Sequence, residues 1–199
     1  MSAAPYKHRF SVRAIDRFDL AFALLVLALF VLVGATFREY AVSNDEGLQH
    51  HYGELIVAYY TSGFTDKSVF NFGNLYLYGG LFDVVAVLLA HVLPFDLYDI
   101  RHVLCALIGI GGVVATWAAA RMIAGPRAGL LAGLALALCG VWYGGMFNHT
   151  KDVPFASAMM ARRFICCAPR VIFPIRNGAI FYGSGYFWAL PLACARPAY

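Results

Sequence analysis

The stretch SNDEGLQHHYGE, residues 43–54, places three carboxylates and two imidazoles within twelve positions of an otherwise apolar chain. Side chains of these types can act as general bases or hold a divalent cation through oxygen ligands. Asp45 and Glu46 are adjacent. Glu46, His50 and Glu54 recur at every fourth position and therefore share one face of a helix. Helix capping by the acids and a solvated face for the trio are the alternatives.

A second polar group lies in MFNHTKDVPFA, residues 146–156, directly after an apolar run. Lys151 and Asp152 stand just before Pro154, a residue that suits the first turn of a helix, so Asp152 is expected near a helix cap. A lysine beside a carboxylate at the end of a membrane span is also suited to binding a lipid phosphate. The spacing leaves both roles open.

Membrane helices must position these groups. The chain has 199 residues, of which 61% are hydrophobic and 13% charged, against roughly 25% charged residues in an average soluble domain. Apolar runs at about 20–37, 103–123 and 128–147 are each long enough, or nearly so, to cross a hydrocarbon core of about 30 Å. A cleaved signal peptide is the alternative for the first run, although its apolar region usually has only about 7–15 residues. The predicted fold is all-α, a polytopic membrane helical bundle.

The remaining composition points to lipid rather than to nucleic acid. The net charge of +4 is modest, and no basic stripe with interleaved aromatic residues is present, so we expect no nucleic-acid partner. The five cysteines lack metal-ligand spacing and are predicted to pack among apolar side chains.

Basic residues orient the predicted spans, because cytoplasmic loops are enriched in Lys and Arg. Such residues stand in the N-terminal tail, 1–19, and in the connector RMIAGPR, 121–127. Between Arg38 and Arg101 the chain carries eight acids against three basic residues. We therefore expect both basic segments in the cytoplasm and the loop 38–101 outside.

Segment 75–94 is long enough to span but contains Asp83, and an unpaired acid in mid-membrane costs about 2.5–3.5 kcal/mol on insertion scales. We expect it to lie in the outer interface or to form a re-entrant helix. The chain then has three spans, and the two polar clusters emerge on the same outer face. Their charged residues are Asp45, Glu46, Lys151 and Asp152.

A surface helix is predicted directly after the first span. Ser43 and Glu46 have the spacing of a capping box at its start. The helix ends near the TSG turn at 61–63. The apolar residues that repeat at helical spacing along it are Leu48, Tyr52, Leu55, Ile56 and Tyr59. An amphipathic helix of this kind lies along the membrane surface.

The order of these pieces, over about residues 15–160, resembles the N-terminal part of the GT-C glycosyltransferases. The matching pieces are the pair Asp45-Glu46, Arg101 at the head of RHVLCALIGIGGVVATW, and Asp152 before Val-Pro. The resemblance is closest to the dolichyl-phosphate-mannose protein mannosyltransferases and to the bacterial aminoarabinose transferases of lipid A.

The resemblance implies an activity and a set of site residues. Members of this family move a sugar from a polyprenyl phosphate to an acceptor at the outer membrane face, usually with inversion at the anomeric carbon. By position, Asp45 resembles the catalytic base and Asp152 the second acid of the site, with Glu46 completing the acidic group. Arg101 and Lys67 resemble substrate-binding residues of the family, although Lys67 lacks the proline that follows the corresponding lysine of the aminoarabinose transferases. Lys151 is a third candidate for substrate binding, as a partner of the phosphate, and it is inferred from its own position rather than from the resemblance.

The resemblance also implies a location and leaves the cofactor open. We expect a multi-pass protein of the bacterial inner membrane with its active face outward, and a polyprenyl-phosphate sugar as its lipid partner. Some members of the family hold a divalent metal, and whether this chain does so is not decided by its sequence.

Residues 161–199 differ in character from the rest of the chain. They contain no Asp, Glu or Lys but five arginines, four of the eight prolines and three of the five cysteines. This composition is typical of a GC-rich gene translated in the wrong frame, so we expect an N-terminal fragment with roughly 160 authentic residues that is inactive by itself. An irregular fourth span is the alternative.

Two other functions remain compatible with the sequence. In a small transporter or channel subunit, Asp83, His91 and Arg101 would line a polar path. In a non-catalytic membrane scaffold, every acid named above would be a helix cap or part of a solvated face.

Overall fold

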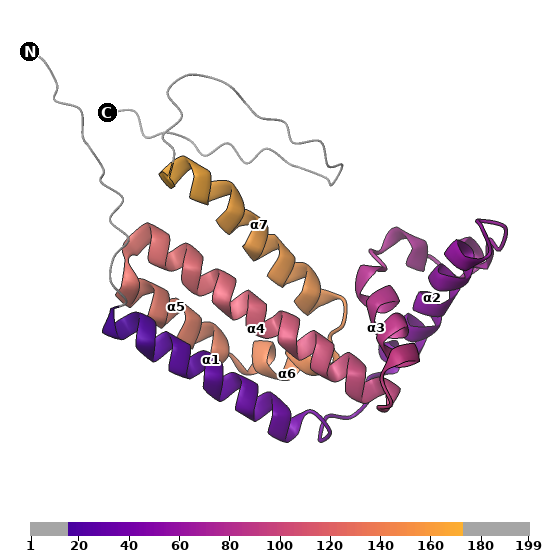
Figure 1. Cartoon of the computed structure of the whole chain (residues 1–199), viewed down its shortest axis with the longest axis horizontal. Coiled ribbons are helices and arrows are strands. Elements are labelled where there is room, and N and C mark those ends of the chain that lie inside the picture. Colours follow the sequence, from indigo (N-terminus) through magenta and orange to yellow (C-terminus); the bar gives the residue numbers. More distant parts are fainter. Residues whose placement is uncertain (1–15, 173–199) are drawn as a thin grey trace, which may run out of the picture.

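The computed structural model describes the backbone of residues 16–172 and the side chains of residues 16–165. Every secondary-structure element in this part of the chain is a helix (Figure 1). The predicted all-α fold class is therefore confirmed for the described residues. The predicted cytoplasmic tail, 1–19, lies almost wholly outside them.

Two helices are long and apolar enough to cross a membrane, α1 (Arg17–Thr36) and α4 (Leu97–Ala124). They correspond to the predicted spans 20–37 and 103–123. Six large apolar side chains of α1 are exposed, as expected for a helix that is apolar on all sides and faces lipid. The length and composition of these two helices thus support a location in a membrane.

α1 and α4 run antiparallel, because each end of α1 is tied to the opposite end of α4. At one end Arg121 donates two hydrogen bonds to the carboxylate of Asp19, at 2.6 and 2.7 Å. At the other end Nδ1 of His102 lies 3.2 Å from the carbonyl oxygen of Phe37, just beyond α1. The end that holds Phe37 and His102 is called the site end below.

The predicted third span, 128–147, is two helices rather than one. α5 (Pro126–Ala137) and α6 (Gly140–Asn148) are bent against each other by 62°. Cys139 between them has extended backbone, and α6 contains three glycines, which have low helix propensity. The described residues therefore contain two candidate spans, or three if the bent pair crosses as one unit.

α7 (Asp152–Ile172) packs along α4 and continues past residue 160 (Figure 1). The change in composition at residue 161 is therefore not the end of a helix, and the backbone stays helical through Pro169. The remainder of the segment predicted to be aberrant, 173–199, lies outside the described residues.

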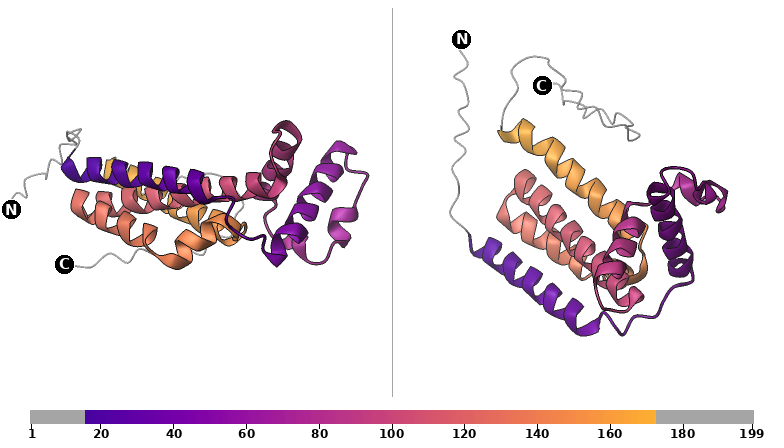
Figure 2. Two further views of the ribbon diagram at one scale, coloured as in Figure 1. Left: turned by 90° about the horizontal axis from the view of Figure 1, so that it is seen from below. Right: turned by 45° about the vertical axis from the view of Figure 1, so that its right-hand side comes forward.

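The connection between α1 and α4 folds beside the site end (Figures 1 and 2). It contains α2 (Asn44–Thr61), the 3₁₀ helices η1 (Ser68–Asn71) and η2 (Leu75–Leu77), and α3 (Leu81–Val92). With 12 residues, α3 is about 18 Å long. α3 alone is therefore too short to cross a hydrocarbon core of about 30 Å.

α2 begins as predicted, but the face that it buries overlaps only in part with the predicted apolar stripe. Ser43 is its N-cap, and the capping box with Glu46 is formed. Leu48, predicted to belong to the apolar stripe, is 46% exposed. The fully buried residues of α2 are Glu46, Gln49, Tyr52 and Gly53. A polar stripe at helical spacing therefore faces the protein, while Leu55, Ile56 and Tyr59 pack only partly around Tyr52.

Gly53 allows α2 and α3 to approach closely. A Cβ atom at this position would lie 2.8 Å from the backbone oxygen of Asp83, which is too close for a carbon in contact with rigid backbone. Gly47, in the same helix, has its nearest neighbour at 3.7 Å, the hydroxyl of Tyr98. The absence of a side chain is thus required at one glycine of α2 and not at the other.

These two glycines make a matched test of the packing. Gly53→Ala is expected to destabilise the protein by about 1–3 kcal/mol through overpacking. Gly47→Ala is expected to be neutral or stabilising, since Ala exceeds Gly in helix propensity by up to about 1 kcal/mol. Thermal unfolding midpoints of both variants in one detergent would show the difference, and equal midpoints would contradict the close contact.

Candidate functional site

A buried ion pair joins α3 to α4 at the site end. Nη2 of Arg101 donates to Oδ1 of Asp83 at 2.8 Å, and both side chains are almost completely buried. The same nitrogen lies 3.4 Å from the hydroxyl of Thr150, and the guanidinium stands over the Phe82 ring. Burial raises the pKa of Asp83 above its usual value, while the hydrogen bond and charge of Arg101 oppose this shift.

Glu46 and His102 form a second buried pair. Oε1 of Glu46 lies 3.1 Å from Nε2 of His102, and its Oε2 accepts a 2.6 Å hydrogen bond from the backbone N–H of Ser43. The other ring nitrogen of His102 faces the carbonyl oxygen of Phe37. Oε1 of Glu46 and Nε2 of His102 are thus close enough for an ion pair but do not have the geometry of a hydrogen bond.

Gln49 links the buried ion pair to Lys151. Its amide nitrogen donates to Oδ2 of Asp83 at 3.1 Å, and its amide oxygen accepts from Nζ of Lys151 at 3.0 Å. The network sets this orientation of the amide, since the opposite one would place acceptor against acceptor and donor against donor. The two oxygens of Asp83 are therefore bonded to different helices.

The charged groups of the two sequence clusters meet at the surface above this network. Nζ of Lys151 lies 3.7 Å from Oδ2 of Asp45, whose side chain is 74% exposed. The ammonium also stands over the ring of Tyr78, 5.2 Å from its centroid. Asp152 is 85% exposed, with an oxygen 3.7 Å from Nδ1 of His149. Asp45, Tyr78, Lys151 and Asp152 are called the polar mouth below.

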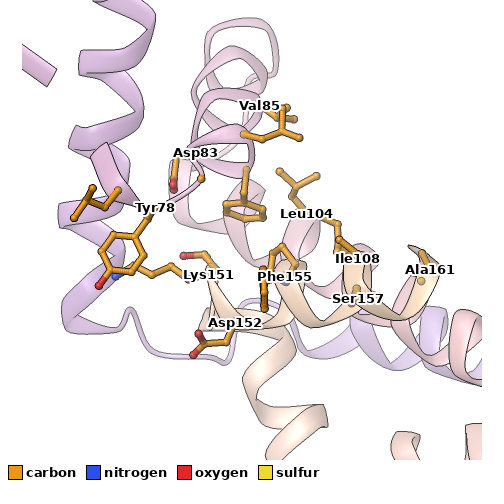
Figure 3. A pocket seen from close by; sticks show the side chains of 18 residues that line it. Tyr78, Asp83, Val85, Leu104, Ile108, Lys151, Asp152, Phe155, Ser157 and Ala161 are labelled. Carbon is orange, nitrogen blue, oxygen red and sulfur yellow. The ribbon is translucent and has the colours of Figure 1, made fainter. Parts of the chain in front are cut away.

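An open cleft of about 880 Å³ extends from the polar mouth between α3, α4 and α7 (Figure 3). Asp83, Thr150, Lys151 and Asp152 lie at its polar end, and a further polar residue, Ser157, lies deeper along α7. Its other walls are apolar and reach along α7 as far as Ala161, past Phe82, Leu104, Ile108 and Phe155. An apolar groove with a cation at one end has the form needed for an amphiphile with an anionic head.

The structure places the predicted site residues at different depths. Asp45 and Lys151 come together, and Asp152 lies beside Lys151 at the end of the cleft. Arg101 and Glu46 are 0% exposed, so neither side chain reaches a molecule in the cleft as the protein stands. Both act within the packing, Arg101 on Asp83 and Glu46 on the start of α2.

Lys67 belongs to a different part of the surface. It is exposed at the N-cap of η1, in the connection that follows α2. It does not line the cleft at the polar mouth. In the part of the chain that the structure describes, Lys67 therefore makes no contact that supports its predicted role in substrate binding.

The trio Glu46, His50 and Glu54 does not converge on a common point. Glu46 turns toward His102, whereas Nε2 of His50 pairs with Glu54 at 3.2 Å. Within residues 16–165, whose side chains are described, no three Asp, Glu, His or Cys side chains are arranged to hold a metal ion. The hydrogen bond from His51 lowers the pKa of Glu54, with a smaller contribution from the charge of His50.

The polar path of the transporter alternative is not formed by the three residues named for it. Arg101 and Asp83 are bonded directly to each other inside the protein. His91 lies two turns further along α3, where its Nδ1 bonds to the carbonyl oxygen of Val87. Its ring therefore interacts with its own helix rather than with the ion pair.

Sequence analysis missed the residues that connect the predicted ones. Gln49 lies four positions after Asp45, and Thr150 directly precedes Lys151. Glu46, Gln49 and Gly53 recur at helical spacing and therefore share one face of α2. A search for apolar residues alone does not identify this face as buried, because two of its residues are polar and one is glycine. No signal in the sequence paired Asp83 with Arg101.

No family model, curated protein or solved structure matches this chain.

Loss of the buried ion pair should be costly. Arg101→Met leaves the Asp83 carboxylate buried without its counter-charge, and we expect a loss of about 3–5 kcal/mol in stability. The double variant Arg101→Met/Asp83→Leu should regain part of this loss, because no buried charge remains. Unfolding midpoints in detergent measure both effects.

Arg38 provides the matched control for this experiment. Its ion pair with Asp99 has a similar distance, 3.1 Å, but the Arg38 side chain is 66% exposed. Arg38→Met should therefore cost only about 0–1 kcal/mol. An Arg101→Met variant as stable as Arg38→Met would show that the buried pair contributes nothing specific.

Proposed function

We propose that this protein is the N-terminal part of a membrane glycosyltransferase of the GT-C type, and that the intact enzyme transfers a sugar from a polyprenyl-phosphate donor to an acceptor at the outer face of a membrane. One observation carries the proposal. Asp45, which the family resemblance assigns to the reaction, lies 3.7 Å from Lys151, and Lys151 lines the polar end of an apolar cleft.

The cleft suits the donor in both of its parts. The apolar walls formed by α3, α4 and α7 offer a surface for a polyprenyl chain, and the chain can enter from the lipid because the cleft is open. The ammonium of Lys151, held at the polar mouth, is placed to neutralise the donor phosphate. Asp152, beside it, is available to a sugar hydroxyl.

Asp45 is suited to act as the general base. Its carboxylate is exposed at the polar mouth, so an acceptor hydroxyl can reach it. In the proposed step Asp45 takes the hydroxyl proton while the acceptor oxygen attacks the anomeric carbon from the side opposite the phosphate. The bond from this carbon to the phosphate oxygen breaks, and the polyprenyl phosphate leaves as an anion beside Lys151.

Other predicted residues receive supporting roles. Glu46 fixes the start of α2, and with it the position of Asp45, through its hydrogen bond to Ser43 and its ion pair with His102. Arg101 holds Asp83 and contacts Thr150, the residue before Lys151. Both therefore position the reacting groups and do not touch the substrate. A bacterial inner-membrane location, with the polar mouth outward, completes the proposal.

The central test is the replacement of Asp45 by Asn in an intact, full-length version of the enzyme, because the present chain is expected to be inactive by itself. The amide cannot accept the proton, so transfer from a polyprenyl-phosphate mannose or aminoarabinose donor should fall by about 10²–10⁴-fold. Release of polyprenyl phosphate measures the reaction. Asp66→Asn is the control, because Asp66 lies in the connection after α2 and bonds only to Ser68 nearby. If the Asp45 variant kept the parental rate, Asp45 would not be the base.

The topology can be tested without activity. Single cysteines placed at positions 45 and 152, in a chain without its native cysteines, should both react with a membrane-impermeant maleimide from outside intact cells. A cysteine at position 127, in the first turn of α5, should react only after permeabilisation. Reaction of positions 45 and 152 from opposite sides would exclude a shared outer site.

A further inference from the structure

The side chain of Gln49 is 1% exposed, yet every polar atom of its amide faces a charged group. Its nitrogen donates to the carboxylate of Asp83 and its oxygen accepts from the ammonium of Lys151. We propose that Gln49 is the positioning residue that holds the Lys151 ammonium at the end of the cleft, next to Asp45. The chemical use of Lys151 rests on the proposed function, whereas the positioning itself does not.

An uncharged amide suits the position between these two groups. A single side chain must present a donor to a carboxylate and an acceptor to an ammonium, and the amide of Gln does both without adding charge. A glutamate could accept from Lys151 but would need a proton to bond to Asp83. A leucine would leave Oδ2 of Asp83 and Nζ of Lys151 without their shared partner, and unpaired buried polar groups are costly.

The anchor of Gln49 is rigid, because Asp83 is itself held. Oδ1 of Asp83 accepts from Arg101 and Oδ2 accepts from Gln49. The chain of bonds therefore runs from α4 through α3 and α2 to Lys151, at the start of α7. Gly53, one turn beyond Gln49, provides the close approach of α2 to α3 that this chain of bonds requires.

This arrangement determines how the ammonium is presented. A lysine has three N–H donors. One is bonded to Gln49, and a second faces Asp45 at 3.7 Å. The third remains for an oxygen of a molecule in the cleft, whose wall Lys151 forms together with Tyr78 (Figure 3). Gln49 thus fixes the orientation of the N–H groups of Lys151 as well as the position of the ammonium in the cleft.

Lysine labelling tests this role directly, because the sequence contains only three lysines, at positions 7, 67 and 151. Trace acetic anhydride acetylates the neutral amine, with acetate leaving, so the Lys151 ammonium must lose a proton and its bond to Gln49 before it reacts. The full-length protein is labelled in nanodiscs, and mass spectrometry measures the extent of acetylation at each lysine. The labelling ratio is the extent of acetylation at Lys151 divided by that at the exposed Lys67.

Gln49→Leu should raise this ratio by about fivefold, the size expected from the loss of one hydrogen bond. Gln49→Glu keeps an oxygen acceptor for Lys151 and should leave the ratio at or below the parental value. If Gln49 served only to fill space, the ratio would stay at the parental value in Gln49→Leu, because a leucine fills a similar volume. Glu54→Gln, an exposed change in the same helix, should leave the ratio unchanged.

The outcome does not depend on catalysis. An unchanged ratio in Gln49→Leu, or a raised ratio in Gln49→Glu, would overturn the positioning role whatever the activity of the protein. If Gln49→Leu fails to fold, the labelling ratio of Gln49→Glu relative to that of the parent still tests the positioning role. Loss of the proposed function, by contrast, would appear as unchanged transfer in the Asp45→Asn variant.

Discussion

The ion pair between Arg101 and Asp83 is the constraint on which the arrangement of the site end depends. An arginine with no exposed surface must be neutralised inside the protein. Its partner comes from α3, which also packs Phe82 and Ala86 into the core beside α4. Once Asp83 is held, its second oxygen sets the position of Gln49, and Gln49 sets that of Lys151. Charge neutralisation in the interior thereby determines the geometry at the surface.

Local features of the site end follow from the sequence because they depend on neighbouring residues. The capping box of Ser43 and Glu46, the end of α2 at Thr61 and the start of α7 at Asp152 agree with prediction. So do the two long apolar helices, whose length and lack of charge need no tertiary information. The encounter of Asp45 with Lys151 agrees with the predicted common face.

Features that depend on distant residues were not predictable in this way. The hydrophobicity of 128–147 gives no sign of the 62° bend, because a break in the backbone hardly alters composition. Glu46 was predicted to lie at the surface together with Asp45. Consecutive residues of a helix are rotated by about 100° around its axis, so the Glu46 side chain points into the protein while that of Asp45 stays exposed. The pairing of Asp83 with Arg101 required knowledge of how α3 lies against α4.

The polar mouth joins two segments that are made at different times. Asp45 and Lys151 are separated by more than a hundred residues, so α2 and the ion pair of α3 with α4 are synthesised well before α7. Until α7 is made, Gln49 and Asp45 therefore lack Lys151 as a partner. Docking of α7 completes the polar mouth and the cleft in one step, because a chain that ends before residue 150 has the capping box of α2 and the ion pair of Arg101 with Asp83 but lacks the wall that α7 contributes.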